Sequence, residues 1–143
     1  MKHFEYPVSF KRAKEGGYVV TCRDLPGLVT QGNDRSDALA QAADAMDEVF
    51  ATLIKLGKPF PTPSEPGRSE RLVSPPMETV AKAALYSTLR RAKITKVELA
   101  RQLGIDEKEV RRLLDPHYQS KLPRIAEAVA VLGKRLVLSL ESA

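Results

Sequence analysis

Residues 96–114 of the chain are KVELARQLGIDEKEVRRLL, and they carry the clearest structural signal in the sequence. Thr95 is suited to cap a first short helix, and Gly104 ends that helix because glycine accepts a left-handed backbone conformation. Asp106 is suited to cap a second helix immediately afterwards. The residues expected to face a shared core are Val97, Leu99, Ala100, Leu103, Ile105, Val110, Leu113 and Leu114. The segment therefore predicts two helices joined by an abrupt turn.

This order of apolar residues resembles the helix-turn-helix of phage-repressor-like regulators. In such proteins the second helix enters the DNA major groove, about 12 Å wide, where basic side chains meet base edges or phosphates. We therefore expect a DNA-binding surface on the exposed sides of the two helices and the loop that follows. Its predicted members are Thr95, Lys96, Glu107, Lys108, Arg111, Arg112, His117 and Lys121.

The second helix also begins with acidic residues, close to where phosphates would lie. Asp106 is explained by capping, and Glu107 could accept a hydrogen bond from a cytosine amino group. Glu109 is expected either to pair with Arg112 or to face solvent. These carboxylates predict a modest affinity that depends on a dimer.

The net charge of +5 is divided unevenly along the 143 residues. Residues 1–66 carry 8 Lys/Arg against 9 Asp/Glu, whereas residues 67–143 carry 15 against 9. A near-neutral half joined to a basic half predicts two partners, with polyanion binding confined to the second half. A composition of 43% hydrophobic and 29% charged residues is typical of a soluble globular protein.

The first half predicts a small antiparallel sheet and one helix. Alternating apolar residues indicate strands, and a pair of glycines indicates a tight turn between them. Apolar residues at three- and four-residue spacing indicate a helix. The predicted elements are a strand at 3–11, a turn at 15–17, a strand at 18–22, a turn at 24–27, a strand at 28–31, and a helix from the cap Asp34 to about Gly57.

Residues 58–76 hold six of the ten prolines, which excludes a continuous helix there. We expect a stiff linker at 58–69, then an extended segment at 70–74 that returns to the first sheet. Pro75-Pro76 is suited to open the next helix. The chain is thus predicted to hold two domains, residues 1–75 including the linker and residues 76–143.

The chain is expected to end with a further helix up to Gly133 and a closing strand, in which Leu136, Leu138 and Leu140 alternate. A lone strand after helices needs a partner, because an unpaired edge is costly. Pairing with the same strand of a second copy would give a twofold homodimer, as a palindromic DNA site requires. The predicted fold class is α+β, with an N-terminal antiparallel sheet and one helix, and a C-terminal all-α domain with a closing strand.

The chain as a whole resembles the HicB antitoxins that carry a C-terminal helix-turn-helix. The supporting motifs are Gly17-Tyr18, Asp24-Leu25-Pro26-Gly27, Thr30-Gln31-Gly32, Asp37-Ala38, Ile94-Thr95, Glu98-Leu99-Ala100-Arg101, Arg112-Leu113-Leu114-Asp115-Pro116-His117 and Leu132-Gly133-Lys134-Arg135-Leu136. Members often have a cysteine where this chain has Leu28 and a threonine cap where it has Asp34; both replacements preserve the local physics.

The resemblance implies what each half does. The first half would be a truncated ribonuclease-H-like fold that binds a small basic HicA toxin and blocks its mRNA-cleaving site. The second half would bind double-stranded operator DNA and repress the operon that encodes both proteins. For the toxin surface we expect the sheet edge and the acidic residues of the first helix, Asp44, Asp47 and Glu48, which could steer a basic partner. A merely solvated helix face is the alternative for each of them.

An enzyme is a second class to weigh, because ribonuclease-H-like folds can hold metal-dependent nucleases. Such sites need several converging carboxylates. Here Glu5, Glu15 and Asp24 fall on strands or turns, and Asp34 and Asp37 have capping roles. We therefore expect no catalytic residues, no metal and no cofactor.

The single cysteine, Cys22, excludes an internal disulfide, and no segment approaches the roughly 20 apolar residues of a membrane span. We expect a cytoplasmic protein with no membrane partner. The remaining alternative is a stand-alone transcription regulator whose first half senses a small molecule, although a hairpin and one helix offer little volume for a pocket.

Overall fold

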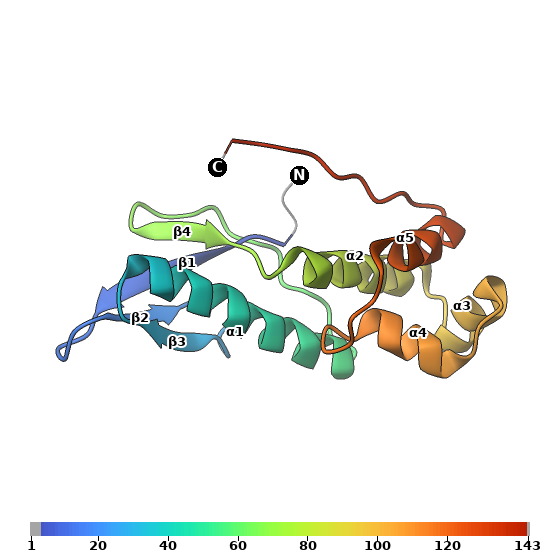
Figure 1. Ribbon diagram of the computed structural model, residues 1–143, viewed down its shortest axis with the longest axis horizontal. Helices are drawn as coiled ribbons and strands as arrows, with labels where there is room; N and C mark the ends of the chain where they lie inside the picture. Colours follow the sequence, from blue (N-terminus) through green and yellow to red (C-terminus); the bar gives the residue numbers. More distant parts are fainter. Residues whose placement is uncertain (1–3, 143) are drawn as a thin grey trace. The chain divides into compact units, whose positions relative to one another are not determined.

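The computed structural model describes residues 4–142, and over them it contains a four-stranded antiparallel sheet and five helices (Figure 1). In chain order the elements are β1 (Tyr6–Arg12), β2 (Tyr18–Thr21), β3 (Val29–Gly32), α1 (Arg35–Lys55), β4 (Glu70–Val73), α2 (Met77–Ala92), α3 (Lys96–Leu103), α4 (Glu107–Leu114) and α5 (Leu122–Val131). The chain divides within α2 into two compact units, Met1–Val80 and Ala81–Ala143. The predicted α+β class, with a sheet and one helix before a set of helices, is confirmed.

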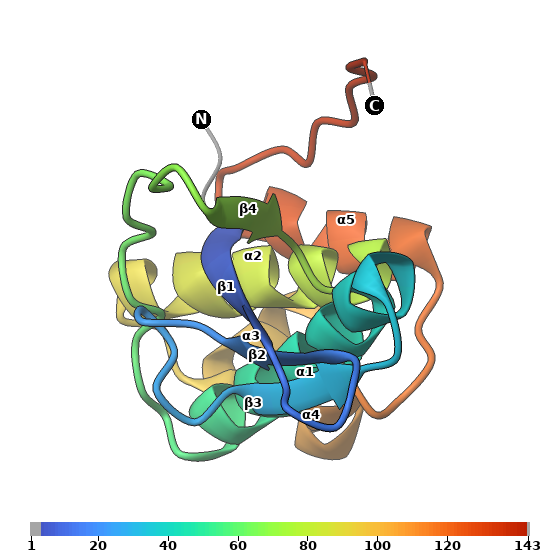
Figure 2. The same cartoon turned by 90° about the vertical axis from the view of Figure 1, so that its left-hand side faces the viewer.

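The sheet of the N-terminal unit has the order β3-β2-β1-β4, and α1 packs against it (Figure 2). β1 is central because it pairs with β2 on one side and with β4 on the other. The predicted strand β1 is confirmed, and Tyr6 and Val8 are fully buried as expected, but Pro7 between them is buried too and Phe10 is only partly buried, so burial does not follow the predicted alternation. Its predicted first residue, His3, lies outside the described residues. The apolar side chains buried from α1 are Ala38, Ala42, Met46, Phe50, Ala51 and Ile54.

The start of α1 is fixed by a reciprocal cap. The Asp34 side chain accepts the backbone N–H of Asp37 at 2.8 Å, and the Asp37 side chain accepts the N–H of Asn33 at 2.8 Å. Immediately before this cap, Gly32 approaches the helix so closely that a Cβ there would lie 2.5 Å from the Ala38 Cα. Strand β3 therefore turns directly into the helix without room for a side chain.

Residues 58–69, expected as a stiff linker, connect α1 to β4 inside the N-terminal unit. The Tyr6 hydroxyl donates to the carbonyl of Pro61 at 2.7 Å, and Ser64 donates its backbone N–H and its hydroxyl to the Asp24 carboxylate, both at 2.7 Å. The segment is therefore an anchored strap rather than a free spacer, and we call it the proline-rich strap. It leads into β4, which pairs with β1 as the extended segment was expected to do.

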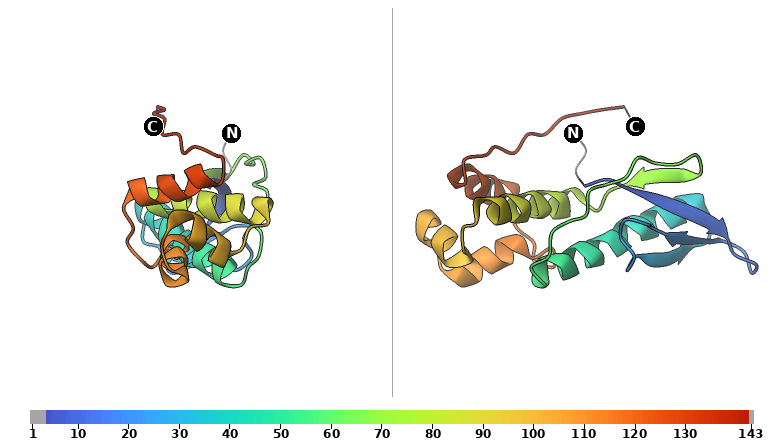
Figure 3. Two further views of the ribbon diagram at one scale, coloured as in Figure 1. Left: turned by 90° about the vertical axis from the view of Figure 1, so that its right-hand side faces the viewer. Right: turned by 180° about the vertical axis from the view of Figure 1, so that it is seen from behind.

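In the C-terminal unit, α3 contacts both α4 and α5 (Figure 3). The core of the C-terminal unit is formed by apolar side chains from α2, α3, α4 and α5. They are Ala81, Ala83, Leu85, Tyr86, Leu89, Leu99, Ala100, Val110, Leu113, Leu114, Ile125, Ala128 and Val129.

One core prediction for this unit is wrong. Val97 is 63% exposed, whereas Leu99 is fully buried. Successive helix residues are separated by about 100°, so Val97 lies on the opposite side of this short helix from Leu99. Its position in the first turn leaves it in solvent.

The closing strand is not formed within the single chain. Residues 134–142 leave α5 as an irregular segment (Figure 3), with Val137 at 75%, Leu138 at 70% and Leu140 at 100% exposure. A strand exists only through hydrogen bonds to a neighbouring strand, and the described part of this unit is otherwise helical. We call residues 134–142 the C-terminal tail.

Candidate functional site

The two helices of the predicted helix-turn-helix are capped as expected. The Thr95 hydroxyl accepts the backbone N–H of Glu98 at 3.1 Å, and the Asp106 carboxylate accepts that of Glu109 at 2.9 Å. Between them Gly104 adopts φ 70° and ψ 30°, the left-handed conformation that the sequence predicted. These contacts satisfy backbone groups that helix ends leave unpaired, so the angle between α3 and α4 is set by local chemistry.

Helix α4 has one buried side and one strongly basic side. Lys108, Arg111 and Arg112 are all exposed. Because they are three and four residues apart, they share one side of the helix. Arg111 lies 3.8 Å from the Glu107 carboxylate, and the Arg112 guanidinium lies over the ring of Tyr118, 5.5 Å from its centroid. We call these three cations the α4 basic face.

The other predicted DNA contacts lie at the start of α3 and in the loop after α4. Thr95 and Lys96 are exposed at the first turn of α3, although the Thr95 hydroxyl is occupied as the cap. His117 and Lys121 are exposed in the loop, where His117 Nδ1 lies 3.5 Å from the Asp115 carboxylate.

Glu109 does not pair with Arg112; its side chain is 45% exposed, so it faces solvent in part, but it also has a partner that was not expected. Its carboxylate lies 3.3 Å from Arg124 on α5. This pairing across 15 residues links α4 to α5, and the sequence around Glu109 alone could not reveal it. It also leaves Arg112 of the α4 basic face available to Tyr118.

Helix α3 presents a further cation, Arg101, outside the predicted set. Its guanidinium forms two hydrogen bonds with the Glu98 carboxylate, the one from Nε at 2.8 Å. This hydrogen bond lowers the pKa of Glu98 to about 2. Since Glu98 stays ionised and close, it offsets the charge of Arg101 more fully than Glu107, 3.8 Å away, offsets that of Arg111, and α4 also carries Lys108 and Arg112.

The most informative residue that sequence reasoning missed is Lys82 on α2. It is fully buried, and its ammonium donates to the carbonyls of Arg112 at 2.9 Å, Asp115 at 2.7 Å and Tyr118. Carbonyls at the C-terminal end of a helix carry partial negative charge, which suits a buried cation. Lys82 therefore fixes the end of α4 and the loop that follows. The sequence did contain an indication that Lys82 is buried, because it lies in a repeat of three- and four-residue spacing with the apolar residues Leu85, Tyr86 and Leu89.

In the N-terminal unit the three acidic candidates on α1 separate into two kinds. Asp44 and Glu48 are exposed and one turn apart. Asp47 is partly buried, and its carboxylate accepts a hydrogen bond from the hydroxyl of the buried Thr79. Asp44 and Glu48 remain candidates for an external partner because both side chains are exposed, whereas the Asp47 carboxylate is engaged by Thr79.

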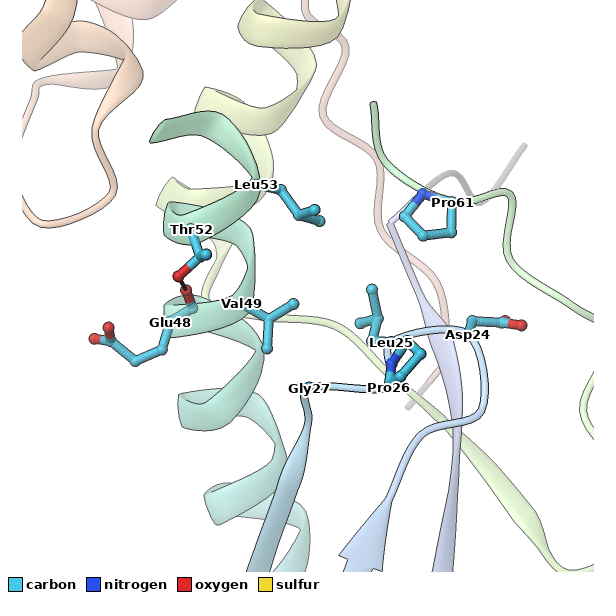
Figure 4. Close-up of a pocket in the computed structure, with 9 residues that line it drawn as sticks. All are labelled: Asp24, Leu25, Pro26, Gly27, Glu48, Val49, Thr52, Leu53 and Pro61. Carbon is cyan, nitrogen blue, oxygen red and sulfur yellow. Dashed lines mark hydrogen bonds between the residues drawn. The ribbon is translucent and has the colours of Figure 1, made fainter. Parts of the chain in front are cut away.

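Beside this part of α1 lies a groove of about 420 Å³ that the sequence did not predict (Figure 4). It runs between α1, the Asp24–Gly27 turn and the proline-rich strap. We call it the α1 groove. Val49 and Leu53 point into it from the helix, and their opposing apolar side chains are Leu25, Pro26 and Pro61.

The carboxylates that an enzyme would need are not gathered. Among residues 4–142, no group of three or more His, Cys, Asp or Glu side chains is arranged to hold a metal ion. The Asp24 carboxylate is engaged by Ser64, as described above. Cys22 is buried, and burial raises the pKa of its thiol. Within residues 4–142, no helix is long and apolar enough to cross a membrane.

Comparison with known proteins gives one consistent family. Residues 5–84 match the model of the HicB-like antitoxins of bacterial toxin-antitoxin systems. The chain is 36% identical over 137 residues to antitoxin HicB 2 of Photorhabdus laumondii, covering 96% of each protein. It is 32% identical over 133 residues to antitoxin HicB of Escherichia coli, covering 93% of this chain and 96% of that protein. It is also 32% identical to antitoxin HicB of Pseudomonas fluorescens over 142 residues, covering 98% of this chain and 96% of that protein.

Proposed function

The chain belongs to the HicB-like antitoxin family of bacterial toxin-antitoxin systems, and from this we propose that it neutralises a HicA-type mRNA-cleaving toxin and represses its own operon. Residues 1–75 would bind the toxin, and residues 76–143 would bind operator DNA and dimerise. The α4 basic face is the observation that carries the DNA-binding half of this proposal.

The DNA contact follows from the geometry of α4. An exposed helix with cations at three- and four-residue spacing can lie in the major groove and present Lys108, Arg111 and Arg112 to base edges or phosphates. Thr95, Lys96, His117 and Lys121 would contact the flanking backbone, and Glu107 would read a cytosine or hold Arg111. The affinity would depend strongly on salt, because phosphate contacts release counterions.

The proposal that the N-terminal unit binds the toxin is supported by membership of the antitoxin family. The family model covers residues 5–84 and so includes the whole sheet, α1 and the proline-rich strap. Membership in an antitoxin family indicates a regulatory protein rather than an enzyme, and we propose that it blocks the toxin by binding alone. It would act in the cytoplasm, where its operator and the toxin's mRNA substrates lie.

The C-terminal tail supports a homodimer. Of its alternating apolar residues Leu138 and Leu140 are exposed in the single chain and Leu136 is partly buried, and a second copy would supply a strand for them to pair with. A pair of identical strands related by a twofold axis would place two α4 helices for a palindromic site.

Two experiments test the two halves of the proposal, one for each. Expression of the small reading frame beside the gene should arrest growth, and co-expression of this chain should restore it. The purified chain should bind the operon's promoter fragment and leave an unrelated fragment of equal length unbound. Growth arrest without rescue would contradict the antitoxin proposal, and equal binding of both fragments would contradict specific repression.

A further inference from the structure

The α1 groove is an apolar surface on a rigid frame. Val49 and Leu53 on α1 face Leu25 and the rings of Pro26 and Pro61, so its sides are almost entirely hydrocarbon (Figure 4). Leu25 is buried at its base, whereas Pro26 is exposed. A hollow lined in this way is typical of a site that binds a partner rather than of ordinary surface.

Hydrogen bonds hold the sides of this groove in place. Asp24 accepts two hydrogen bonds from Ser64, both at 2.7 Å, which join the turn to the proline-rich strap. The Tyr6 hydroxyl donates to the carbonyl of Pro61 at 2.7 Å and holds this part of the strap to β1. A groove formed before binding avoids the entropy cost of ordering its sides, and this favours affinity.

The charges around the groove indicate the partner. Of the exposed α1 residues that line the groove, Glu48 is acidic and Thr52 is neutral, and a second acidic residue, Asp44, lies one turn before Glu48 outside the groove. The Glu48 carboxylate points away from the groove, along the outer side of α1 (Figure 4). The Asp24 carboxylate is engaged by Ser64. The interior thus offers no ionised group to a small polar ligand. The acidic outer side of α1 next to the groove, which we call the acidic rim, would attract a cation carried by the same partner segment.

We infer that the α1 groove is the anchor site for the toxin, and that it takes an apolar side chain from a toxin segment that also carries lysine or arginine. This inference rests on the proposed function, since it names the surface with which the antitoxin holds its partner. The apolar side chain fills the space between Val49 and Leu53 and the opposing prolines, and the neighbouring cation meets Glu48 and Asp44. Buried anchors of this kind carry most of the binding energy of an interface, while charges at its rim steer association.

The test is the affinity of the full chain for the purified product of the small reading frame beside the gene. Val49→Lys places a cation inside the groove and should weaken binding at least about 30-fold. Ala40→Lys adds the same charge at an exposed position of α1 that does not line the groove, and should leave the affinity within about threefold. Circular dichroism and the melting temperature establish that both variants fold.

A second pair of variants keeps the test independent of folding. Val49→Ala removes part of the apolar wall, and should lower the affinity mainly through faster dissociation. Glu48→Gln changes only an exposed side chain, and should slow association and reduce its dependence on salt.

If wild-type chain binds the toxin and Val49→Lys and Val49→Ala bind equally well, the groove is not the anchor, although the proposed function stands. If Glu48→Gln associates as fast as the wild type at low salt, the acidic rim does not steer the partner and the inference fails in that respect. If the wild-type chain does not bind the toxin, the inference and the proposed function fail together.

Discussion

The ammonium of Lys82 lies 2.9 Å from the carbonyl oxygen of Arg112, so a fully buried cation on α2 holds the end of the helix proposed to read DNA. Lys82→Met should keep the volume of the side chain but leave the carbonyls of Arg112, Asp115 and Tyr118 without this donor. We expect a loss of about 2–4 kcal/mol in the stability of the C-terminal unit. Hydrogen exchange of the α4 amides would measure it. Lys108→Met, an exposed lysine on α4, is the control and should change stability by less than about 0.5 kcal/mol. Equal exchange in wild type and Lys82→Met would contradict a structural role for the buried ammonium.

Arg111 and Arg112 should be needed for DNA binding and not for toxin neutralisation. Replacing both with alanine should weaken operator binding at least about 30-fold, because each interaction with a base or phosphate contributes roughly 1–3 kcal/mol. The dependence of log K on log salt should become shallower by about 0.9 for each phosphate that the variant no longer neutralises. Fluorescence anisotropy over a range of salt concentrations measures the operator affinity and its salt dependence. Rescue of growth measures toxin neutralisation. Replacing the exposed Arg68 and Arg71 with alanine removes the same two positive charges from the N-terminal unit and should leave operator binding unchanged. Failure of both functions in the double variant would mean that the two halves do not act separately.

Much of the helix-turn-helix could be predicted because its determinants are local. Thr95 and Asp106 cap helices through their own side chains, and Gly104 adopts its left-handed conformation in the turn itself. Such signals lie within three or four residues of the backbone groups that they satisfy. The same holds for Asp34 at the start of α1 and for Gly57 after its end.

The errors and omissions arose where contacts are distant in sequence. Lys82 bonds to carbonyls at least 30 residues away, and Glu109 pairs with Arg124 across 15 residues. Val97 was assigned to the core by residue type, but the short α3 leaves its first turn uncovered. The α1 groove depends on Pro61 reaching the Asp24–Gly27 turn, and no periodic pattern in the sequence encodes that approach.

Gly32 should tolerate no side chain. A Cβ there would lie 2.4 Å from the backbone nitrogen of Ala38 and 2.5 Å from its Cα, atoms that cannot move without displacing α1. We expect Gly32→Ala to destabilise the N-terminal unit by about 2 kcal/mol or more. Chemical denaturation followed by circular dichroism would measure the change. Gly27→Ala is the control, because nothing lies within 4 Å of a Cβ at that position. Equal stability of the two variants would mean that β3 and α1 are less closely packed than the structure indicates.

The Glu98–Arg101 pair should make the C-terminal unit sensitive to acid. The folded-state pKa of Glu98 is lowered from 4.5 to about 2 by its hydrogen bond from Arg101. A carboxyl group with a lowered pKa contributes stability that is fully present above its unfolded value, and that stability is lost as the pH falls towards the folded value. The loss should therefore fall between about pH 4.5 and pH 2, and Glu98→Gln should reduce the pH dependence in that range. Arg101→Ala should have the same effect, because it removes the donor. Thermal melts at several pH values would measure it, and an unchanged profile in both variants would show that the pair does not contribute.

The C-terminal tail should be required for dimerisation and hence for tight operator binding. Deleting residues 134–143 removes the C-terminal tail, whose described residues 134–142 are mostly exposed and pair with no strand among residues 4–142, so the C-terminal unit itself should remain folded. Equilibrium sedimentation should show a dimer for the wild type and a monomer for the deletion at micromolar concentration. Operator binding should weaken because two α4 helices are no longer joined.

Point variants in the tail test the same prediction. Leu138→Arg places a charge in the middle of the proposed paired strand and should act like the deletion. Ser139→Thr, at a neighbouring position, preserves strand-forming character and should not weaken dimerisation. A wild type that is monomeric well above micromolar concentration would remove the tail from the mechanism and leave each α4 to bind DNA alone.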